Sequence, residues 1–177
     1  ALDRELAYAR HYPAINWLNS YSGYIKVLDD WYEKTVSENV PRVRSKMLEI
    51  LYEEKKLQEI VMLVGEDVLP DDQRLILEIA KVMKIGFLQQ NAFHKEDTYV
   101  PIEKQFQMLK TIEHLYDRSY KAVRDGIPIS QIKDEKLFND ITKMKYNIPN
   151  DNLQGLEDLN SKIDKFYNGL EEKYSND

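Results

Sequence analysis

An apolar stripe with helical spacing runs through residues 43–64, and it is the strongest constraint that this sequence places on the fold. The stretch between Pro41 and Gly65 contains no glycine or proline. Side chains three or four positions apart share one face of an α-helix, so the stripe predicts a long amphipathic helix. Proline suits the first helical turn and glycine the C-terminal cap, which gives the helix its two ends. The stripe consists of Val43, Met47, Ile50, Leu51, Leu57, Ile60, Val61 and Val64.

A second helix is predicted directly after an acidic turn. Pro70, Asp71 and Asp72 place negative charge at the positive end of the helix dipole. The helix should then continue through Phe87, which makes residues 57–93 an antiparallel helix-turn-helix. Its apolar positions are Leu75, Ile79, Val82, Met83 and Phe87.

Gly86 interrupts this second helix. Glycine in a helix costs roughly 0.5–1 kcal/mol relative to alanine, so its presence predicts either a kink or close backbone packing.

The same periodicity predicts four further helices, with glycine, proline and polar segments between them. The fold class is therefore all-α: a bundle of about six helices around a central antiparallel helix-turn-helix. The sequence shows no internal repeat and no convincing strand. The four additional helices cover residues 20–35, 101–125, 130–143 and 152–174, and the third of these is the weakest.

Composition narrows the function classes. The 177 residues suit one folded domain, with 42% hydrophobic and 32% charged residues. The chain has no cysteine, which excludes disulfides and favours a reducing compartment, with the cytoplasm as the expected location. Its 25 basic and 31 acidic side chains give a net charge of −6, which argues against nucleic-acid binding.

No apolar run approaches the roughly 18 residues of a membrane span, so we expect no membrane insertion. The start at Ala1 and the polar end fit a processed chain and an excised fragment equally well.

The sequence holds no recognisable catalytic motif. None of its glycines forms a phosphate-binding loop or a dinucleotide fingerprint, and no serine lies in a nucleophile elbow. The histidines His11, His94 and His114 lack the spacing of a metal site. Acidic pairs such as Asp29-Asp30 are typical of solvent-facing helix positions. We therefore assign no catalytic and no metal-binding residue.

Two aromatic residues lie in non-helical breaks of the sequence. Tyr12 precedes Pro13, and Phe93 follows Gln90-Asn91-Ala92. Aromatic residues at breaks often line pockets, although most aromatic residues simply pack in a core. The pattern alone leaves both interpretations open.

Several runs, in order along nearly the whole chain, resemble the region that follows the nucleotide-binding core in the catalytic A subunit of V/A-type rotary ATPases. The resemblance implies a C-terminal helical domain at residues 20–177, preceded by a connecting segment at residues 1–19. It also implies a fragment that lacks the phosphate-binding loop and should be inactive alone, whereas the intact protein hydrolyses or synthesises ATP with H⁺ or Na⁺ transport. The fragment should hold no cofactor, and the intact protein should bind ATP or ADP with Mg. The runs are HYPAINWLNSYS at residues 11–22, LQEIVMLVG at 57–65, LQQNAF at 88–93, DTY at 97–99 and MKY at 144–146.

The same resemblance assigns two sites. Tyr12 and Phe93 match the aromatic residues that pack on the adenine ring, with Pro13, Gln90 and Ala92 beside them. An aromatic clamp suits a purine because stacking adds about 0.5–1.5 kcal/mol per pair beyond area burial. The acidic turn matches the tip that meets the rotor of the motor, and it consists of Glu66, Asp67, Val68, Leu69, Pro70, Asp71 and Asp72.

The resemblance also implies partner proteins, and two other identities for the chain compete with it. The resemblance implies the B subunit and the central-stalk (rotor) subunits as partners, within a soluble, cytoplasmic head that is peripheral to the membrane. One alternative is a stand-alone helical module that binds partner helices without nucleotide. The related non-catalytic B subunit fits less well as an identity, because the runs around residues 13–17 and 89–93 are similar to the catalytic one.

Overall fold

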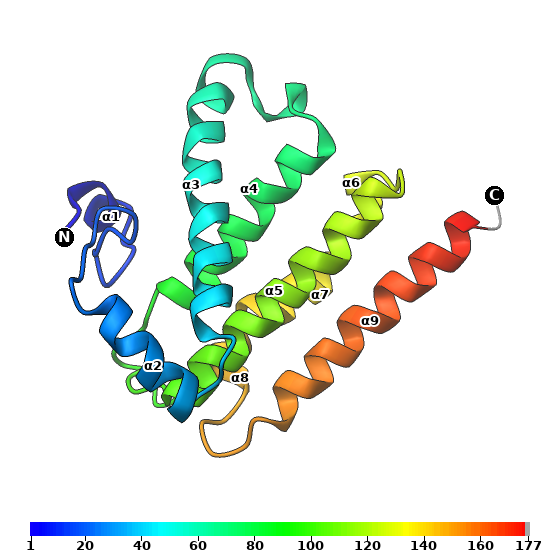
Figure 1. The fold of residues 1–177 in the computed structure, drawn as a ribbon. Helices are drawn as coiled ribbons and strands as arrows, with labels where there is room; N and C mark the ends of the chain where they lie inside the picture. Colours follow the sequence, from blue (N-terminus) through cyan, green and yellow to red (C-terminus); the bar gives the residue numbers. More distant parts are fainter. Residues whose placement is uncertain (176–177) are drawn as a thin grey trace.

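A computed structural model describes residues 1–175, and these residues form an all-α structure (Figure 1). This confirms the predicted fold class. Outside the helices, the described part of the chain contains one isolated antiparallel bridge, between Leu2 and Ile15. The elements are α1 (Arg4–Tyr8), α2 (Ile25–Thr35), α3 (Val40–Val64), a 3₁₀ turn η1 (Glu66–Val68), α4 (Asp71–Met83), a π-helical turn η2 (Lys84–Leu88), α5 (Ile102–Arg124), α6 (Ile129–Ile132), α7 (Glu135–Thr142), α8 (Met144–Asn147) and α9 (Gln154–Ser175).

The predicted helix-turn-helix is present as α3, η1 and α4, and it projects at the top of Figure 1. Pro41 lies in the first turn of α3, and Gly65 caps its end with a φ of 87°, a left-handed value that favours glycine. Asp71 and Asp72 lie in the first turn of α4. Both ends of α3 and the acidic start of α4 therefore agree with the sequence prediction.

The base of the hairpin differs from the prediction. The second helix does not remain α-helical through Phe87, because α4 ends at Met83 and the chain continues as the π-helical turn η2. Gly86 lies inside this turn with its backbone against α7, where a Cβ atom would come within 3.1 Å of the Thr142 Cα. Of the two explanations proposed for this glycine, the structure therefore supports close backbone packing.

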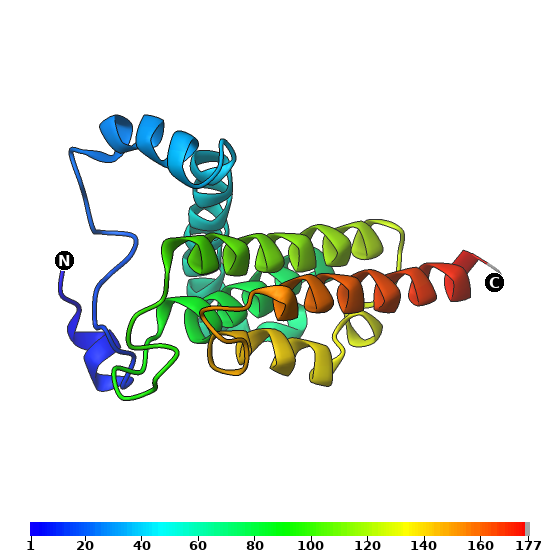
Figure 2. The same ribbon diagram turned by 90° about the horizontal axis from the view of Figure 1, so that it is seen from below.

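The main core lies where α3, α4 and η2 meet α5, α7 and α9. Helices α5 and α9 run side by side in the same direction in both Figure 1 and Figure 2, and α7 packs between α4 and α9. This arrangement leaves α5 surrounded by helices and buries its central residues. Fully buried core residues include Val43, Ile79, Ile112, Leu115, Ile141 and Ile163.

Tyr167 of α9 provides a polar contact inside this core. Its hydroxyl lies 2.6 Å from the Ser119 Oγ and donates to the Ile132 carbonyl at 3.1 Å. Burial raises the pKa of Tyr167 to about 12, so its hydroxyl stays protonated. One hydroxyl thus connects α9 to both α5 and α6.

The structure also differs from the sequence predictions in four further details. The connecting segment contains a short helix, α1, and the helix expected from residue 20 begins only at Ile25. The helix expected at residues 130–143 is divided into α6 and α7. Two positions of the long apolar stripe, Ile60 and Val64, are 43% and 53% exposed. Each difference lies where packing partners are missing or where the chain turns. Helical periodicity carries no information about either.

Candidate functional site

Residues 89–99 form an exposed loop between η2 and α5, and they carry the second predicted adenine-binding aromatic. The Phe93 side chain is 100% exposed, and Tyr12 of the N-terminal segment is 55% exposed. Pro13, Gln90 and Ala92 are exposed as well. The structure thus places all five predicted adenine-binding residues on the surface, where a neighbouring molecule can reach them.

A main-chain hydrogen bond joins the two segments that carry these residues. The N–H of Gln90 donates to the carbonyl oxygen of Tyr12 at 2.7 Å. The Gln89 side chain adds a longer bond of 3.4 Å to the Arg10 carbonyl. The Tyr12–Pro13 peptide is cis. The tertiary structure therefore brings the Tyr12 segment and the Gln90 segment together, although they are distant in sequence.

Short polar contacts shape the loop around Phe93. The Thr98 hydroxyl donates to the carbonyls of Ala92 and His94, at 2.8 Å each. The N–H of Phe93 donates to the Asn91 side chain at 3.0 Å. These bonds fold the loop onto itself and leave the Phe93 ring exposed to solvent.

Asp97 is the buried residue that holds the loop to the rest of the fold. It is 2% exposed and is the only buried residue of the loop. Its carboxylate accepts a hydrogen bond of 2.6 Å from the Asn91 N–H and lies 3.9 Å from the ammonium of Lys145 in α8. Burial lowers the pKa of Lys145, and the charge of Asp97 partly opposes this effect.

The role of Lys145 could not be predicted from the sequence. This residue lies in the matched run at residues 144–146, yet lysine on a short helix is ordinarily an exposed residue. Nothing in the local sequence indicates that its ammonium is buried, since its partners come from η2 and from the loop.

His11, beside Tyr12, is also buried. Its ring packs against Trp17 with the ring centroids 5.2 Å apart. Burial lowers the pKa of His11, and the charges of Lys145 and Lys84 lower it further. A neutral imidazole is therefore favoured next to the predicted adenine-binding aromatic.

The predicted rotor-contact turn occupies the free end of the hairpin, at the opposite end of α4 from η2 (Figure 1). Glu66, Asp67, Val68, Pro70 and Asp72 are exposed. At about 1.5 Å per residue, the 13 residues of α4 separate this turn from η2 by about 20 Å.

Two members of the turn have partners within the fold. Leu69 packs with Leu57 and Leu77 in a small separate core. The Asp71 carboxylate accepts a hydrogen bond of 3.0 Å from the Ile129 N–H at the start of α6. These two side chains hold the turn in place.

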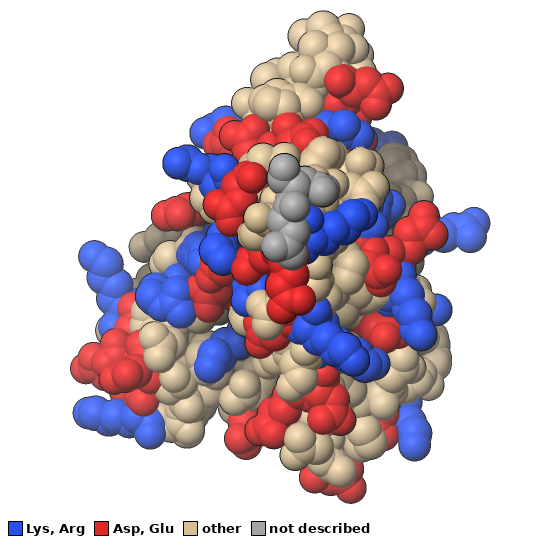
Figure 3. Space-filling view, turned by 90° about the vertical axis from the view of Figure 1, so that its right-hand side faces the viewer, with Lys and Arg blue, Asp and Glu red and all other residues tan. Residues whose placement is uncertain are grey.

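The free end of the hairpin is more apolar than its acidic sequence suggests. Met62, Leu63, Val64 and Val68 are 76%, 84%, 53% and 68% exposed. We call these four residues the tip patch. Figure 3 shows the same end of the molecule covered mainly by uncharged side chains, with acidic groups close by, above a surface of mixed charge. Helical periodicity assigns Val64 to the apolar stripe, and the overlooked signal is a run of five consecutive apolar residues, 60–64, which one helix face cannot bury together.

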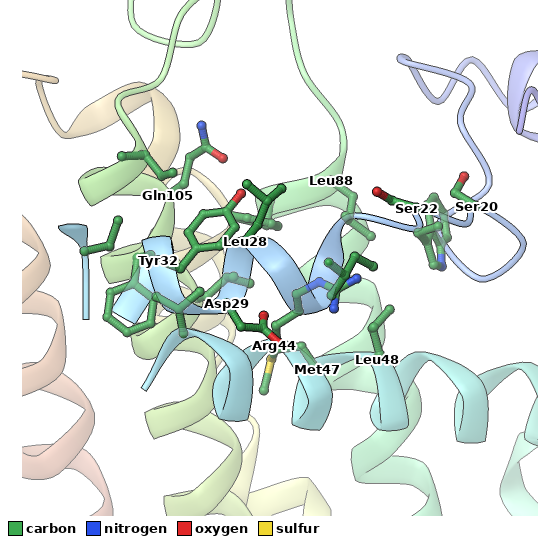
Figure 4. Close-up of a pocket in the computed structure, with 18 of the residues that line it drawn as sticks. Ser20, Ser22, Leu28, Asp29, Tyr32, Arg44, Met47, Leu48, Leu88 and Gln105 are labelled. Carbon is green, nitrogen blue, oxygen red and sulfur yellow. The ribbon is translucent and has the colours of Figure 1, made fainter. Parts of the chain in front are cut away.

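A cavity of about 540 Å³ lies between α2, α3, α5 and η2, apart from both predicted sites. Apolar side chains from two adjacent helices converge on it, including Leu28 of α2 and Met47 and Leu48 of α3 (Figure 4). Neither Tyr12 nor Phe93 lines this cavity. It is therefore a loosely filled space under α2, a helix without a single buried residue.

Residues 1–175 contain no group of three or more His, Cys, Asp or Glu side chains that could hold a metal ion. None of the helices described for these residues is long and apolar enough to span a bilayer.

Together these features define an all-α domain whose predicted contact residues lie on a surface loop and on the end of a helical hairpin. Residues 29–133 match the family model of the C-terminal domain of V and A type ATP synthase. The chain therefore belongs to this family.

Individual relatives agree with the family match. The chain is 63% identical over 173 residues to V-type ATP synthase alpha chain 2 of Clostridium tetani, and 52% identical over 174 residues to V-type ATP synthase alpha chain of Halothermothrix orenii. It is 45% identical over 176 residues to the A-type ATP synthase A subunit of Methanopyrus kandleri. The matches cover 98%, 98% and 99% of this chain but only 29%, 30% and 30% of those proteins. The alternative of an unrelated stand-alone interaction module is not favoured.

Proposed function

We propose that this chain is the C-terminal helical part of the catalytic A subunit of a V/A-type ATP synthase or ATPase. The observation that carries the proposal is the match of 98% of the chain to a V-type ATP synthase alpha chain at 63% identity. In the intact protein, ATP with Mg is hydrolysed or synthesised while H⁺ or Na⁺ is transported. Residues 1–19 connect to the nucleotide-binding domain, and residues 20–177 form the helical domain.

The first role of the chain is to supply the adenine end of the nucleotide site through Tyr12, Pro13, Gln90, Ala92 and Phe93. The hydrogen bond between Gln90 and Tyr12 supports this role because it keeps the two aromatic-bearing segments together. The full exposure of Phe93 supports it as well, because an apolar ring without packing partners is available to stack on a base.

Substituting Phe93→Ala in the intact, assembled enzyme tests the adenine role. Loss of a stacking partner should raise the KM for ATP by up to about tenfold and change kcat little. Tyr99→Ala is a matched control, since Tyr99 is an 81% exposed aromatic residue at the end of the same loop. An unchanged KM for Phe93→Ala would remove Phe93 from the site.

The isolated chain offers a second test. It contains no phosphate-binding loop, and aromatic contacts to a base alone give weak binding. Titration calorimetry with MgATP should therefore detect no binding in the micromolar range. Micromolar affinity would contradict the proposal that this part binds only the base.

The second role is mechanical: the end of the α3–α4 hairpin contacts the central-stalk subunits. The exposed positions Glu66, Asp67, Val68, Pro70 and Asp72 are available for this contact, while Leu69 and Asp71 hold the turn in shape. The tip patch adds apolar area, and buried apolar area is the main favourable term in protein association. We infer that the carboxylates at its edge steer a basic partner surface onto it.

Substituting Leu63→Gln in the assembled complex tests the mechanical role. We expect about tenfold weaker binding of the head to the central stalk, because a largely exposed leucine at a contact contributes about 1–2 kcal/mol. Val27→Gln is the control, as Val27 is 70% exposed on α2, away from the hairpin end. Equal binding by both variants would rule out a contact at the tip patch.

The remaining assignments complete the proposal. The B subunit is the neighbour of this chain in the head, and the head lies in the cytoplasm, peripheral to the membrane. Cross-linking of the assembled complex through single cysteines introduced on α2 identifies this neighbour, since the chain has no natural cysteine to compete. Cross-links that never include the B subunit would contradict this partner.

A further inference from the structure

Lys145 lies where three parts of the chain meet. Its side chain is 2% exposed, and its ammonium donates to the carbonyl of Ile85 at 2.8 Å and to the carbonyl of Gln89. The third neighbour is the carboxylate of Asp97, 3.9 Å away. Two of the three N–H donors of the ammonium therefore have carbonyl acceptors, and the carboxylate balances its charge from ion-pair distance.

These acceptors are linked to the bond between the two aromatic-bearing segments. In a continuing π-helix, the Gln90 N–H would bond the Ile85 carbonyl, five residues earlier. Gln90 instead donates to Tyr12, and the freed Ile85 carbonyl is taken by Lys145. The ammonium of Lys145 thus contacts the end of η2 and Asp97, and it occupies the carbonyl that Gln90 leaves free by bonding to Tyr12.

A second buried lysine supports the same loop from the other side. Lys104 of α5 is fully buried and donates to the carbonyls of Lys145 and Ile148 and to the Asn150 side chain, at 3.1, 2.6 and 2.8 Å. Asn150 in turn binds the loop through the carboxylate and the carbonyl of Glu96, at 2.8 and 3.0 Å. Lys145 is thus held at its own backbone as well as at its ammonium.

Little apolar burial holds the loop otherwise, since only Asp97 of residues 89–99 is buried. Buried ionic groups contribute poorly to net stability because desolvation offsets their attraction, whereas they can specify one geometry among several. The contacts of Lys145 are of the kind that specifies one geometry. They fix where the loop lies relative to η2, the base of the hairpin.

We propose that Lys145, paired with Asp97, is the positioning residue that holds the Phe93 loop in register with the base of the α3–α4 hairpin. The functional part of this inference rests on the proposed contact between Phe93 and adenine. Lys145 itself touches no nucleotide in this proposal. It sets the position of the loop relative to η2 and α4.

Hydrogen exchange on the whole chain tests the positioning itself. Lys145→Met keeps the side-chain volume but removes the donors, and Lys143→Met is the control, since Lys143 is exposed two positions earlier in the chain. We expect amides of residues 89–99 to exchange about tenfold faster in Lys145→Met, with α5 and α9 unchanged. Exchange like that of the control would overturn the proposal.

Asp97→Asn keeps the test decisive if Lys145→Met does not fold. The amide oxygen can still accept from Asn91, but the charge opposite Lys145 is lost. Faster exchange confined to the loop supports the proposal. Loss of protection throughout α5 and α9 in this variant too would overturn it, because the pair would then serve the core rather than the loop.

Kinetics of the intact, assembled enzyme separate this inference from the proposed function. Lys145→Met should raise the KM for ATP and leave kcat nearly unchanged, and it should add nothing further in a Phe93→Ala background. If Phe93→Ala raises KM and Lys145→Met does not, the positioning role is overturned. If Phe93→Ala has no effect, the adenine assignment fails instead, and the exchange experiment still decides whether Lys145 positions the loop.

Discussion

The N–H of Gln90 donates a 2.7 Å hydrogen bond to the carbonyl of Tyr12, which joins the loop after η2 to the segment before α2. This single contact makes one surface out of two segments that are distant in sequence. The base of the hairpin is part of the same unit, because η2 lies just before Gln90 in the chain. A change at this surface therefore has a short covalent path to the free end of the hairpin through α4.

The close packing of Gly86 predicts that a methyl group is not tolerated there. In Gly86→Ala the Cβ would lie 3.1 Å from the Thr142 Cα, a backbone atom that cannot rotate away. We expect a loss of about 1–3 kcal/mol in unfolding free energy, measured by urea denaturation. Gly169→Ala in α9 is the control, since nothing lies within 4 Å of its Cβ position, and it should gain about 0.5–1 kcal/mol. A stabilised Gly86→Ala variant would show that α7 moves away freely.

The buried hydroxyl of Tyr167 predicts a cost for its removal. Tyr167→Phe deprives the Ile132 carbonyl and the Ser119 hydroxyl of a partner, so unfolding free energy should fall by about 1–3 kcal/mol. Tyr120→Phe, at a site 38% exposed, should change it by less than about 0.5 kcal/mol. Equal unfolding midpoints for the two variants would contradict the role of this hydroxyl.

The ion pair between Arg42 and Glu113 predicts a pH-dependent stability. Burial raises the pKa of Glu113, but the hydrogen bonds and charges of Arg42 and Lys46 outweigh it and leave the pKa lowered. A carboxyl with a lowered pKa stabilises the fold above its unfolded pKa, and this stabilisation disappears as pH falls through its folded pKa.

Arg42→Met should therefore cost about 1 kcal/mol at neutral pH, a modest value because Arg42 is half exposed, and the difference from the natural chain should disappear as pH falls through the lowered pKa of Glu113. Urea denaturation across this pH range measures it. Lys56→Met, which breaks an exposed pair with Glu53, should cost little at any pH. A cost for Arg42→Met that persists unchanged at acid pH would mean that packing, not charge, is involved.

Two apolar residues at the end of the hairpin, Leu69 and Leu63, should differ strongly in how much their substitution lowers the unfolding free energy. Leu69→Ala empties part of the small core with Leu57 and Leu77, so it should cost about 2–4 kcal/mol in urea denaturation. Leu63→Gln removes a side chain that is 84% exposed and should change stability by less than about 0.5 kcal/mol. A large cost for Leu63→Gln would show that the tip patch serves the fold rather than a contact.

Much of the fold could be predicted because helical signals are local. The stripe from Val43 to Leu57, the glycine cap at Gly65 and the acidic start at Asp71 each depend on residues within a few positions. The same locality explains the errors. The π-helical turn contains Gly86, whose backbone lies against the distant Thr142, and the short helices α6 and α7 pack against α4.

The adenine-binding and rotor-contact residues come from resemblance, and they stay predictions, whereas their surroundings come from the structure. Tyr12 and Phe93 stand out in the sequence as aromatics at breaks, but nothing there indicates that Gln90 binds Tyr12 or that Lys145 supports the loop. Helical periodicity also placed Val64 in the packed stripe, while the structure leaves it exposed in the tip patch.

Local sequence signals were enough to predict an all-α chain with a central hairpin and no recognisable catalytic motif, because helix spacing, caps and motifs involve residues that are close together in the chain. Only the folded chain shows which apolar residues stay exposed and which acceptors surround the buried ammonium of Lys145. The physical reason is that burial and hydrogen-bond completion depend on which distant segments meet. For Lys145 those segments are η2 and the loop around Asp97, and only the folded chain brings them together.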